Sequence, residues 1–438
     1  MSSIRLQDIK KLRKNFVNNE KARIVSNALT KNDVSTISRV FQAEVDNPNI
    51  FSIDIKTMKV TNQMSSGRCW IFSAMNVFRE MIAKKCNIKD FELSQNYIAF
   101  YDKLEKVNWF MECVINEIKA PLSSQENRFL LETAVGDGGQ WNMLVSLVKK
   151  YGLCPKTAMP ETYQSSHTHE MNEILNRRLR KFAYDIHKAK RNDVEKLRKE
   201  CLKECYGVIA ACFGLPPETF TFEYYDKDDK SHAIHNLTPL KFAKEYLDID
   251  LDDYISVIHG PTKDKPFYKT YSVKHLGNVV DGEEICLLNL PMEELKAAVL
   301  AQMKDNEIVW FGCDCAKEGD RKLGLWDDQQ YDYENTFDIQ LAMSKEEMLE
   351  TRHSMMNHAM VLTGVNLVDD KPTRWKIENS WGDKIANDGY FIASDTWFDK
   401  YVYVVAVNKK YLSKKAQNAL KQKPKVLEPW DPFGTLAK

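Results

Sequence analysis

Residues 69–85 read CWIFSAMNVFREMIAKK, a run that is apolar over much of the circumference of a helix. A helix with so little polar face has to be buried in a core, because water would contact apolar side chains on nearly every side. The flexible pair Ser66 and Gly67 comes just before it, so Cys69 is expected to open the helix. Any fold of this chain must therefore hold a buried helix with a cysteine at its N-terminal end.

The remaining patterns predict an α+β protein with a helical half and a β-rich half. Helical spacing dominates the first part of the chain, whereas strand-like runs such as IVWFGCD, HAMVLTGVNLV and YVYVVAV dominate after about residue 270. Charged helical stretches and a hairpin predicted around residues 226–230 separate the two halves. We therefore expect five parts: an N-terminal arm (1–55), a helical half carrying Cys69 (56–160), an inserted subdomain (161–270), a β-rich half (271–410) and a C-terminal tail (411–438).

Composition excludes several classes of protein. The 438 residues carry 62 basic and 62 acidic side chains, so the formal net charge is zero and no global field attracts nucleic acid or an anionic membrane. No apolar run of about 18 residues occurs, and the N-terminus lacks the pattern of a signal peptide. The ten cysteines are scattered without the spacing of a disulfide framework or a zinc site. We expect a cytoplasmic protein with reduced thiols, no metal and no cofactor.

Cys69 is the candidate nucleophile. A thiol attacks a carbonyl efficiently only as the thiolate, and the N-terminus of a helix together with a nearby imidazolium would favour that form. Gln63 lies six residues upstream on the same loop. Its side-chain amide could donate to the oxyanion that forms on a carbonyl oxygen, together with the backbone N–H of Cys69.

His358 and Asn379 are the candidate base and its orienting partner. Each lies at the end of a strand-like run, in NHAMVLTGV and IENSWGD. An asparagine oxygen that accepts from one imidazole nitrogen would fix the tautomer and leave the other nitrogen for the thiol. Trp381 lies two residues after Asn379 and could shield this hydrogen bond from water.

Six motifs in one order resemble those of papain-like cysteine peptidases. They are QMSSGRCW, LSQNYIAFYD, DGGQW, YGLCP, NHAMVLTG and IENSWGDKIANDGYF. This resemblance implies a papain-like fold with a helical half and a β-barrel-like half, with Gly138 and Gly139 lining the substrate cleft and Asn357 next to substrate. Gly138 and Gly139 could also form a plain turn.

Two differences from the compact papain-like enzymes point to one branch of that family. Ser66 stands where the compact secreted enzymes have a cysteine, and Arg68 replaces a small residue. About 290 residues separate Cys69 from His358, against roughly 130 to 150 in the compact enzymes. The insertion, the arm and the tail EPWDPFGTLAK resemble the bleomycin hydrolase and aminopeptidase C branch, which implies a homohexamer with the C-terminus in the cleft.

The resemblance implies that this protein is an aminopeptidase acting on short peptides. A tail that fills the cleft before the scissile bond leaves room for only a few substrate residues, and its carboxylate can pair with the substrate's α-ammonium. The alternative is an endopeptidase or oligopeptidase, because relatives of that kind share the catalytic motifs. A more distant alternative is nucleic-acid binding by the lysines of the C-terminal segment, positions 409, 410, 414, 415, 421, 423 and 425.

The last two residues generate a first prediction. Tails in this branch commonly end at the position of Ala437, whereas this chain adds Lys438, whose bulk would crowd the place where the carboxylate meets the substrate amine. We therefore expect the enzyme's own site to remove Lys438 and expose the Ala437 carboxylate. The intact mass of the active protein checks this, and full retention of Lys438 together with aminopeptidase activity would contradict it.

Overall fold

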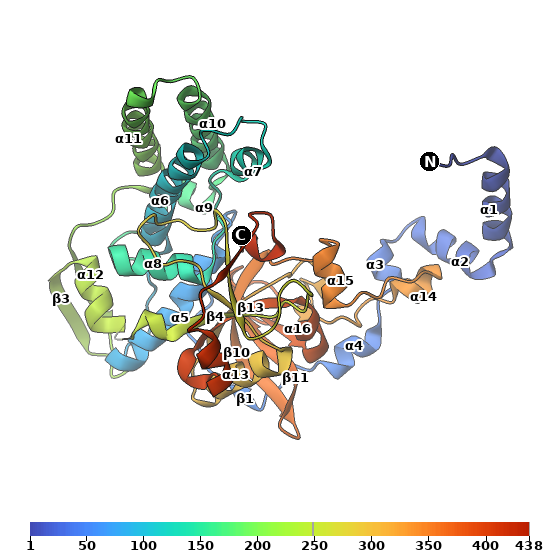
Figure 1. The fold of residues 1–438 in the computed structure, drawn as a ribbon. Coiled ribbons are helices and arrows are strands. Elements are labelled where there is room, and N and C mark those ends of the chain that lie inside the picture. Colours follow the sequence, from blue (N-terminus) through green and yellow to red (C-terminus); the bar gives the residue numbers. More distant parts are fainter. Residues whose placement is uncertain (248, 438) are drawn as a thin grey trace.

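The computed structural model describes residues 1–247 and 249–437, in which a group of helices lies beside a large mixed sheet (Figure 1). The helices are α1 (Leu6–Asn18), α2 (Glu20–Leu29), α3 (Val34–Ile37), α4 (Phe41–Asp46), α5 (Cys69–Cys86), α6 (Gln95–Asn116), α7 (Gln125–Thr133), α8 (Trp141–Tyr151), α9 (Tyr163–Ser166), α10 (His169–Ile186), α11 (Val194–Phe213), α12 (Pro239–Phe242), α13 (Met292–Lys304), α14 (Tyr333–Phe337), α15 (Lys345–Glu350), α16 (Asp395–Tyr401) and α17 (Lys414–Ala419). The strands are β1 (Ile53–Asp54), β2 (Phe220–Tyr225), β3 (Ser231–Leu237), β4 (Tyr254–Ile258), β5 (Lys269–Val273), β6 (Leu287–Asn289), β7 (Val309–Cys313), β8 (Gly319–Asp320), β9 (Leu325–Trp326), β10 (His358–Val368), β11 (Lys371–Glu378), β12 (Tyr390–Ser394), β13 (Val402–Asn408) and β14 (Lys425–Leu427).

The helix α5 is buried along its first three turns and packs directly on the sheet. Its residues from Cys69 to Arg79 are all buried, as the apolar circumference of this segment requires. The Ser73 hydroxyl donates to the carbonyl of Ala359 on β10 at 2.8 Å. The indole N–H of Trp310 on β7 donates to the carbonyl of Trp70 at 3.2 Å. These contacts fix the N-terminal end of α5 against the start of β10.

A buried ionic contact fastens the middle of α5 to the end of β11. The Glu378 carboxylate accepts from Asn76 at 2.7 Å and from Arg79 at 3.1 Å, and both charged side chains are almost fully buried. Burial raises the pKa of Glu378 to about 7, while the Arg79 charge acts in the opposite direction. Because Glu378 immediately precedes Asn379, this contact also fixes the position of the next residue in the chain.

The sheet joins strands that lie far apart in the sequence. Within the described residues it contains twelve strands, in the order β14-β5-β6-β4-β13-β7-β10-β11-β12-β9-β8, with β1 paired to β10. The long strand β10 is central and pairs antiparallel with both β7 and β11. His358, its first residue, lies opposite Cys313. The sheet therefore presents the start of β10 to the N-terminal end of α5.

The block between the two halves consists of α9, α10 and α11 followed by the β2–β3 hairpin. The helices α10 and α11 lie beside α6 in the upper lobe of Figure 1. The hairpin turns at residues 226–230, where the Asp226 N–H donates to the Lys230 carbonyl at 3.0 Å. The strands β4 and β5 follow, and both pair into the large sheet. Apart from β1, the strands of the large sheet therefore begin at Tyr254, within the residues 161–270 predicted as the inserted subdomain.

The two ends of the chain are placed very differently. The arm formed by α1 and α2 projects away from the body and has no buried residue, whereas the C-terminal end lies near the centre, between the helices and the sheet (Figure 1). No helix in the described ranges is long and apolar enough to span a bilayer.

Candidate active site

Cys69 is the first residue of α5, and its side chain is fully buried. The backbone N–H of Ala359 on β10 donates to its sulfur at 3.4 Å. Burial raises the pKa of the Cys69 thiol to about 12, although this N–H and that of Trp70 lower it. Burial therefore favours the neutral thiol, and a thiolate at this position requires a neighbouring cation such as an imidazolium.

His358 immediately precedes Ala359, the residue whose N–H contacts this thiol. Its Nε2 lies 2.9 Å from the Oδ1 of Asn379, and both side chains are buried. An amide oxygen can only accept, so Nε2 donates and carries the proton in the neutral ring. Nδ1 is therefore the nitrogen that can exchange a proton with sulfur. Asn379 Oδ1 also accepts from the backbone N–H of Ser380 at 2.8 Å, which fixes the amide.

Trp381 packs over this pair. Its ring centroid lies 5.0 Å from that of His358 at an interplanar angle of 31°. The guanidinium of Arg321 lies 4.5 Å from the centroid of the Trp381 ring. An aromatic ring against the imidazole reduces access of water, and hydrogen bonds are stronger where water is excluded.

Gln63 is held between two loops by both ends of its side-chain amide. Its Oε1 accepts from the Ser380 hydroxyl at 2.6 Å, and its Nε2 donates to the Ser66 carbonyl at 2.5 Å. The Gln63 backbone N–H also donates to the Ser380 carbonyl at 2.9 Å. The second hydrogen on Nε2 is left for a ligand, because a planar amide carries two.

Gly139 pairs with the C-terminal tail as one strand pairs with another. The Gly139 N–H donates to the Ala437 carbonyl at 3.0 Å, and the Ala437 N–H donates to the Gly139 carbonyl at 3.2 Å. A Cβ at Gly139 would lie 2.4 Å from the Trp70 ring, so only glycine fits here. The Gly138 carbonyl accepts from the buried Lys106 ammonium at 2.6 Å. The tail thus occupies a backbone ladder that an extended peptide could also use.

Of the other predicted site residues, Asn357 lies within the described part of the chain and Lys438 does not. Asn357 precedes His358, and its amide is engaged by the loop after β7: Oδ1 accepts from the Cys315 N–H at 3.1 Å, and Nδ2 donates to the Asp314 carboxylate. No group of three His, Cys, Asp or Glu side chains that could hold a metal ion occurs in residues 1–247 and 249–437.

Several residues around the site were missed by reasoning from the sequence. They are Ser380, which bonds the side chain of Gln63; Lys106, which bonds Gly138; and Glu161, which bonds Arg68 next to Cys69. The arginine at position 68, in place of a small residue of the motif, was a signal that the sequence did contain. Its partner could not be read from the sequence.

Comparison with known proteins shows similarity over almost the whole chain. The family model described as "Peptidase C1-like family" matches residues 3–434. Aminopeptidase C of Listeria innocua serovar 6a is 48% identical over 390 residues, which cover 89% of this chain and 88% of that protein. Aminopeptidase C of Lactobacillus delbrueckii subsp. lactis is 46% identical over 422 residues, 94% of each. The crystal structure of PepW from Lactobacillus rhamnosis HN001 has a TM-score of 0.97 at 44% identity and covers 100% of both chains.

The geometry at His358 predicts the effect of replacing Asn379 by alanine. Without the acceptor for Nε2–H, the ring is less often oriented to form an ion pair with the thiolate, so the apparent pKa of Cys69 should move toward the high value that burial favours. Alkylation of Cys69 by neutral iodoacetamide at pH 7, followed by peptide mapping, should slow roughly ten-fold, which corresponds to a shift of about one pKa unit. Asn366→Ala, on the same strand pair but outside the site, is the matched control. An unchanged pH profile in the Asn379 variant would contradict the assignment.

Proposed function

The chain belongs to the Peptidase C1-like family and is a cysteine aminopeptidase, and we propose that Cys69, His358, Asn379 and Gln63 carry out its chemistry. The family match confirms the resemblance to the bleomycin hydrolase and aminopeptidase C branch. The likeness to a solved relative over the full chain confirms the α+β, papain-like fold. The observation that carries the proposed direction of cleavage is the backbone pairing between Gly139 and Ala437.

Hydrolysis proceeds in two steps at Cys69. The thiolate attacks the peptide carbonyl carbon, and the oxyanion accepts from Gln63 Nε2 and from the Cys69 backbone N–H. The His358 imidazolium then gives its proton to the leaving amine, and a thioester remains on the sulfur. In the second step His358 takes a proton from water, the resulting hydroxide adds to the thioester carbonyl, and the thiolate leaves. The carboxylic acid product loses its proton to solvent, so the site is restored.

The C-terminal tail restricts substrates to those cleaved near their N-terminus. It is anchored along its length, because Gln140 Nε2 donates to the carbonyls of Phe433 and Thr435 at 3.1 and 2.9 Å, and Asp431 pairs with Lys265 at 2.9 Å. With Ala437 on Gly139, a substrate cannot extend far along the same ladder before its scissile bond. Short peptides with a free α-ammonium group are the substrates that this geometry favours, and a chain-terminal carboxylate there would attract that ammonium.

Acetylation of a peptide's N-terminus separates the aminopeptidase from the endopeptidase alternative. We expect the enzyme to release the first residue of the free peptide and to cleave the acetylated form at least about 100-fold more slowly, because acetylation removes the charge and adds bulk next to the tail. The measurement is product formation by chromatography. The Cys69→Ala variant should give no turnover with either peptide. Similar rates for the two peptides would favour an endopeptidase, and turnover by the Cys69 variant would exclude Cys69 as the nucleophile.

The N-terminal arm supports the proposal of a homohexamer. Leu6, Leu12 and Phe16 on α1 are 78%, 65% and 51% exposed, although apolar side chains on one projecting helix usually find a partner surface. The arm contacts the body mainly near α14, where Lys21 pairs with Asp338 at 2.6 Å. A second subunit is the partner that would cover these side chains.

Charge on the apolar face of α1 should therefore disrupt the assembly. The double variant Leu12→Glu/Phe16→Glu is expected to have a smaller mass by light scattering than the hexameric parent, because burying two carboxylates in an interface is costly. Gln7→Glu/Asn15→Glu adds the same charge at exposed polar positions of α1 and should keep the parent mass. A monomeric parent, or an unchanged mass for the first variant, would contradict the proposal.

Two further expectations also belong to this proposal. We place the protein in the cytoplasm, which agrees with its ten cysteines all being free thiols.

Nucleic-acid binding by the C-terminal lysines has less support, because Lys409 pairs with Asp253 at 2.6 Å and Lys410 with Glu307 at 3.2 Å. Lysines paired with carboxylates on their own surface are less available to phosphates.

A further inference from the structure

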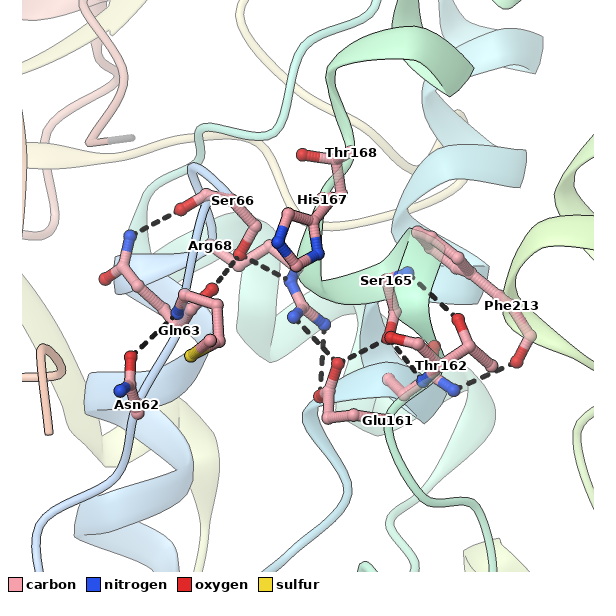
Figure 2. A network of polar contacts seen from close by, with 12 residues as sticks. Asn62, Gln63, Ser66, Arg68, Glu161, Thr162, Ser165, His167, Thr168 and Phe213 are labelled. Carbon is pink, nitrogen blue, oxygen red and sulfur yellow. Dashed lines mark hydrogen bonds and ion pairs between the residues drawn. The ribbon is translucent and has the colours of Figure 1, made fainter.

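Arg68, the residue immediately before Cys69, is buried, and three of its five N–H donors are bonded. Its side chain is only 1% exposed. Its two terminal nitrogens donate to the two carboxylate oxygens of Glu161 at 3.2 and 2.8 Å, and its Nε donates to the Ser66 hydroxyl at 3.0 Å. Figure 2 shows the guanidinium between these two partners. Three directed donors on one planar group leave it a single orientation.

The hydrogen bonds of Ser66 connect the Arg68 guanidinium to Gln63. The Ser66 hydroxyl accepts from Arg68 Nε and donates to the Gln63 backbone carbonyl at 2.6 Å, while the Ser66 carbonyl accepts from Gln63 Nε2 at 2.5 Å. Hydrogen bonds arranged donor to acceptor in a chain strengthen one another in a buried setting. The direction of the remaining N–H of Gln63 Nε2 therefore depends on where Arg68 holds Ser66, together with the bond of the Ser380 hydroxyl to Oε1.

Glu161 is in turn fixed by the block of helices inserted between the two halves. The Ser165 hydroxyl donates to its carboxylate, and the Thr162 hydroxyl donates to the Cys212 carbonyl at 2.7 Å, at the end of α11. The preceding residue, Pro160, accepts through its carbonyl from Asn96 on α6 at 2.7 Å. The inserted block and α6 thus both anchor the segment that carries Glu161, the partner of Arg68.

We propose that Arg68 and Glu161 form a positioning pair that sets the direction of the Gln63 oxyanion donor through Ser66. The inference rests on the proposed function, because it takes Gln63 as the donor. Its physical basis is that an oxyanion hole works only when its donors are already aimed at the position where charge develops. Neither Arg68 nor Glu161 touches the reacting atoms, so both act through the loop.

A second anchor on the same loop allows the pair to be tested without losing the fold. The Gly67 N–H donates to the Asp137 carboxylate at 2.9 Å, and Asp137 is itself held by Lys103 and Asn172. The loop should therefore stay in place when the contacts to Ser66 are removed. Changes in kinetics then report on the direction of Gln63.

The test compares Arg68→Lys, Ser66→Ala and the double variant. Lysine can keep an ion pair with Glu161, but it has no second donor group in the fixed geometry that reaches Ser66. Each single variant should lower kcat roughly ten-fold with KM changed by less than about two-fold, and the double variant should be no slower than the worse single one, because both remove the same link. Glu204→Gln, which breaks the Arg178–Glu204 ion pair between α10 and α11, is the control and should keep the parent's kcat.

Two readouts separate donor positioning from a merely structural or charge effect. Affinity for an amino-acid aldehyde with a free amino group should fall in parallel with kcat, because the Cys69 thiol adds across its carbonyl, the thiol proton ends on that oxygen or on His358, and the oxygen binds in the oxyanion site. The pH profile of Cys69 alkylation should stay as in the parent, because the thiolate and its imidazolium are untouched.

Several outcomes would overturn the inference. They are an unchanged kcat in both single variants, multiplied losses in the double variant, unchanged aldehyde affinity, or a shifted alkylation profile, which would mean that the contacts of Arg68 and Ser66 act on the thiolate and not on the direction of Gln63. The Cys69→Ala variant, measured in parallel, distinguishes failure of the proposed function from failure of the positioning pair. If that variant is active, the proposed function fails; if it is inactive while Arg68→Lys and Ser66→Ala keep full kcat, only the positioning pair fails.

Discussion

The contact between the N-terminal end of α5 and the first residues of β10 is the interaction on which the rest of the site depends. It places the Ala359 backbone nitrogen 3.4 Å from the Cys69 sulfur, and His358 is the preceding residue in the chain. The same packing buries the thiol and raises its pKa to about 12. A buried thiol stays protonated, and is a poor nucleophile, unless a nearby cation stabilises the thiolate. An imidazolium that activates Cys69 therefore has to lie close to the buried N-terminal end of α5.

Buried polar groups account for the architecture around this contact. Two of the side chains proposed to do the chemistry are held by a group from another part of the chain: His358 by Asn379, and Gln63 by Ser380. A buried polar group without a partner is costly, so such links are needed for stability as well as for geometry. Glu378 in its contact with Arg79 and Glu161 in its contact with Arg68 repeat the arrangement with full charges. Stability and orientation are therefore supplied by the same bonds.

The tail shows how a peptidase can limit its own cleft with ordinary backbone hydrogen bonds. Gly139 offers one N–H and one carbonyl, and Ala437 uses both. In the proposed function a substrate strand uses the same two groups, so the tail would compete with long substrates at that position and leave space only for the start of a chain. Because the nearby Trp70 ring requires glycine at position 139, the pairing of the tail and the packing of α5 are linked.

Local periodicity and short motifs were enough to predict the buried helix at 69–85, the later strands, and Cys69, Gln63, His358 and Asn379 as candidates, because each of these signals lies within a few neighbouring residues. The tertiary structure alone decided which distant residues meet. Glu161 pairs with Arg68, 93 positions away in the sequence, and Ser380 pairs with Gln63, 317 positions away. The strand β4 lies within residues 161–270, predicted as an inserted subdomain, but pairs with β13 in the large sheet. The physical reason is that a hydrogen bond or an ion pair depends on distance in space, and the folding of about 300 intervening residues, not their local pattern, sets that distance.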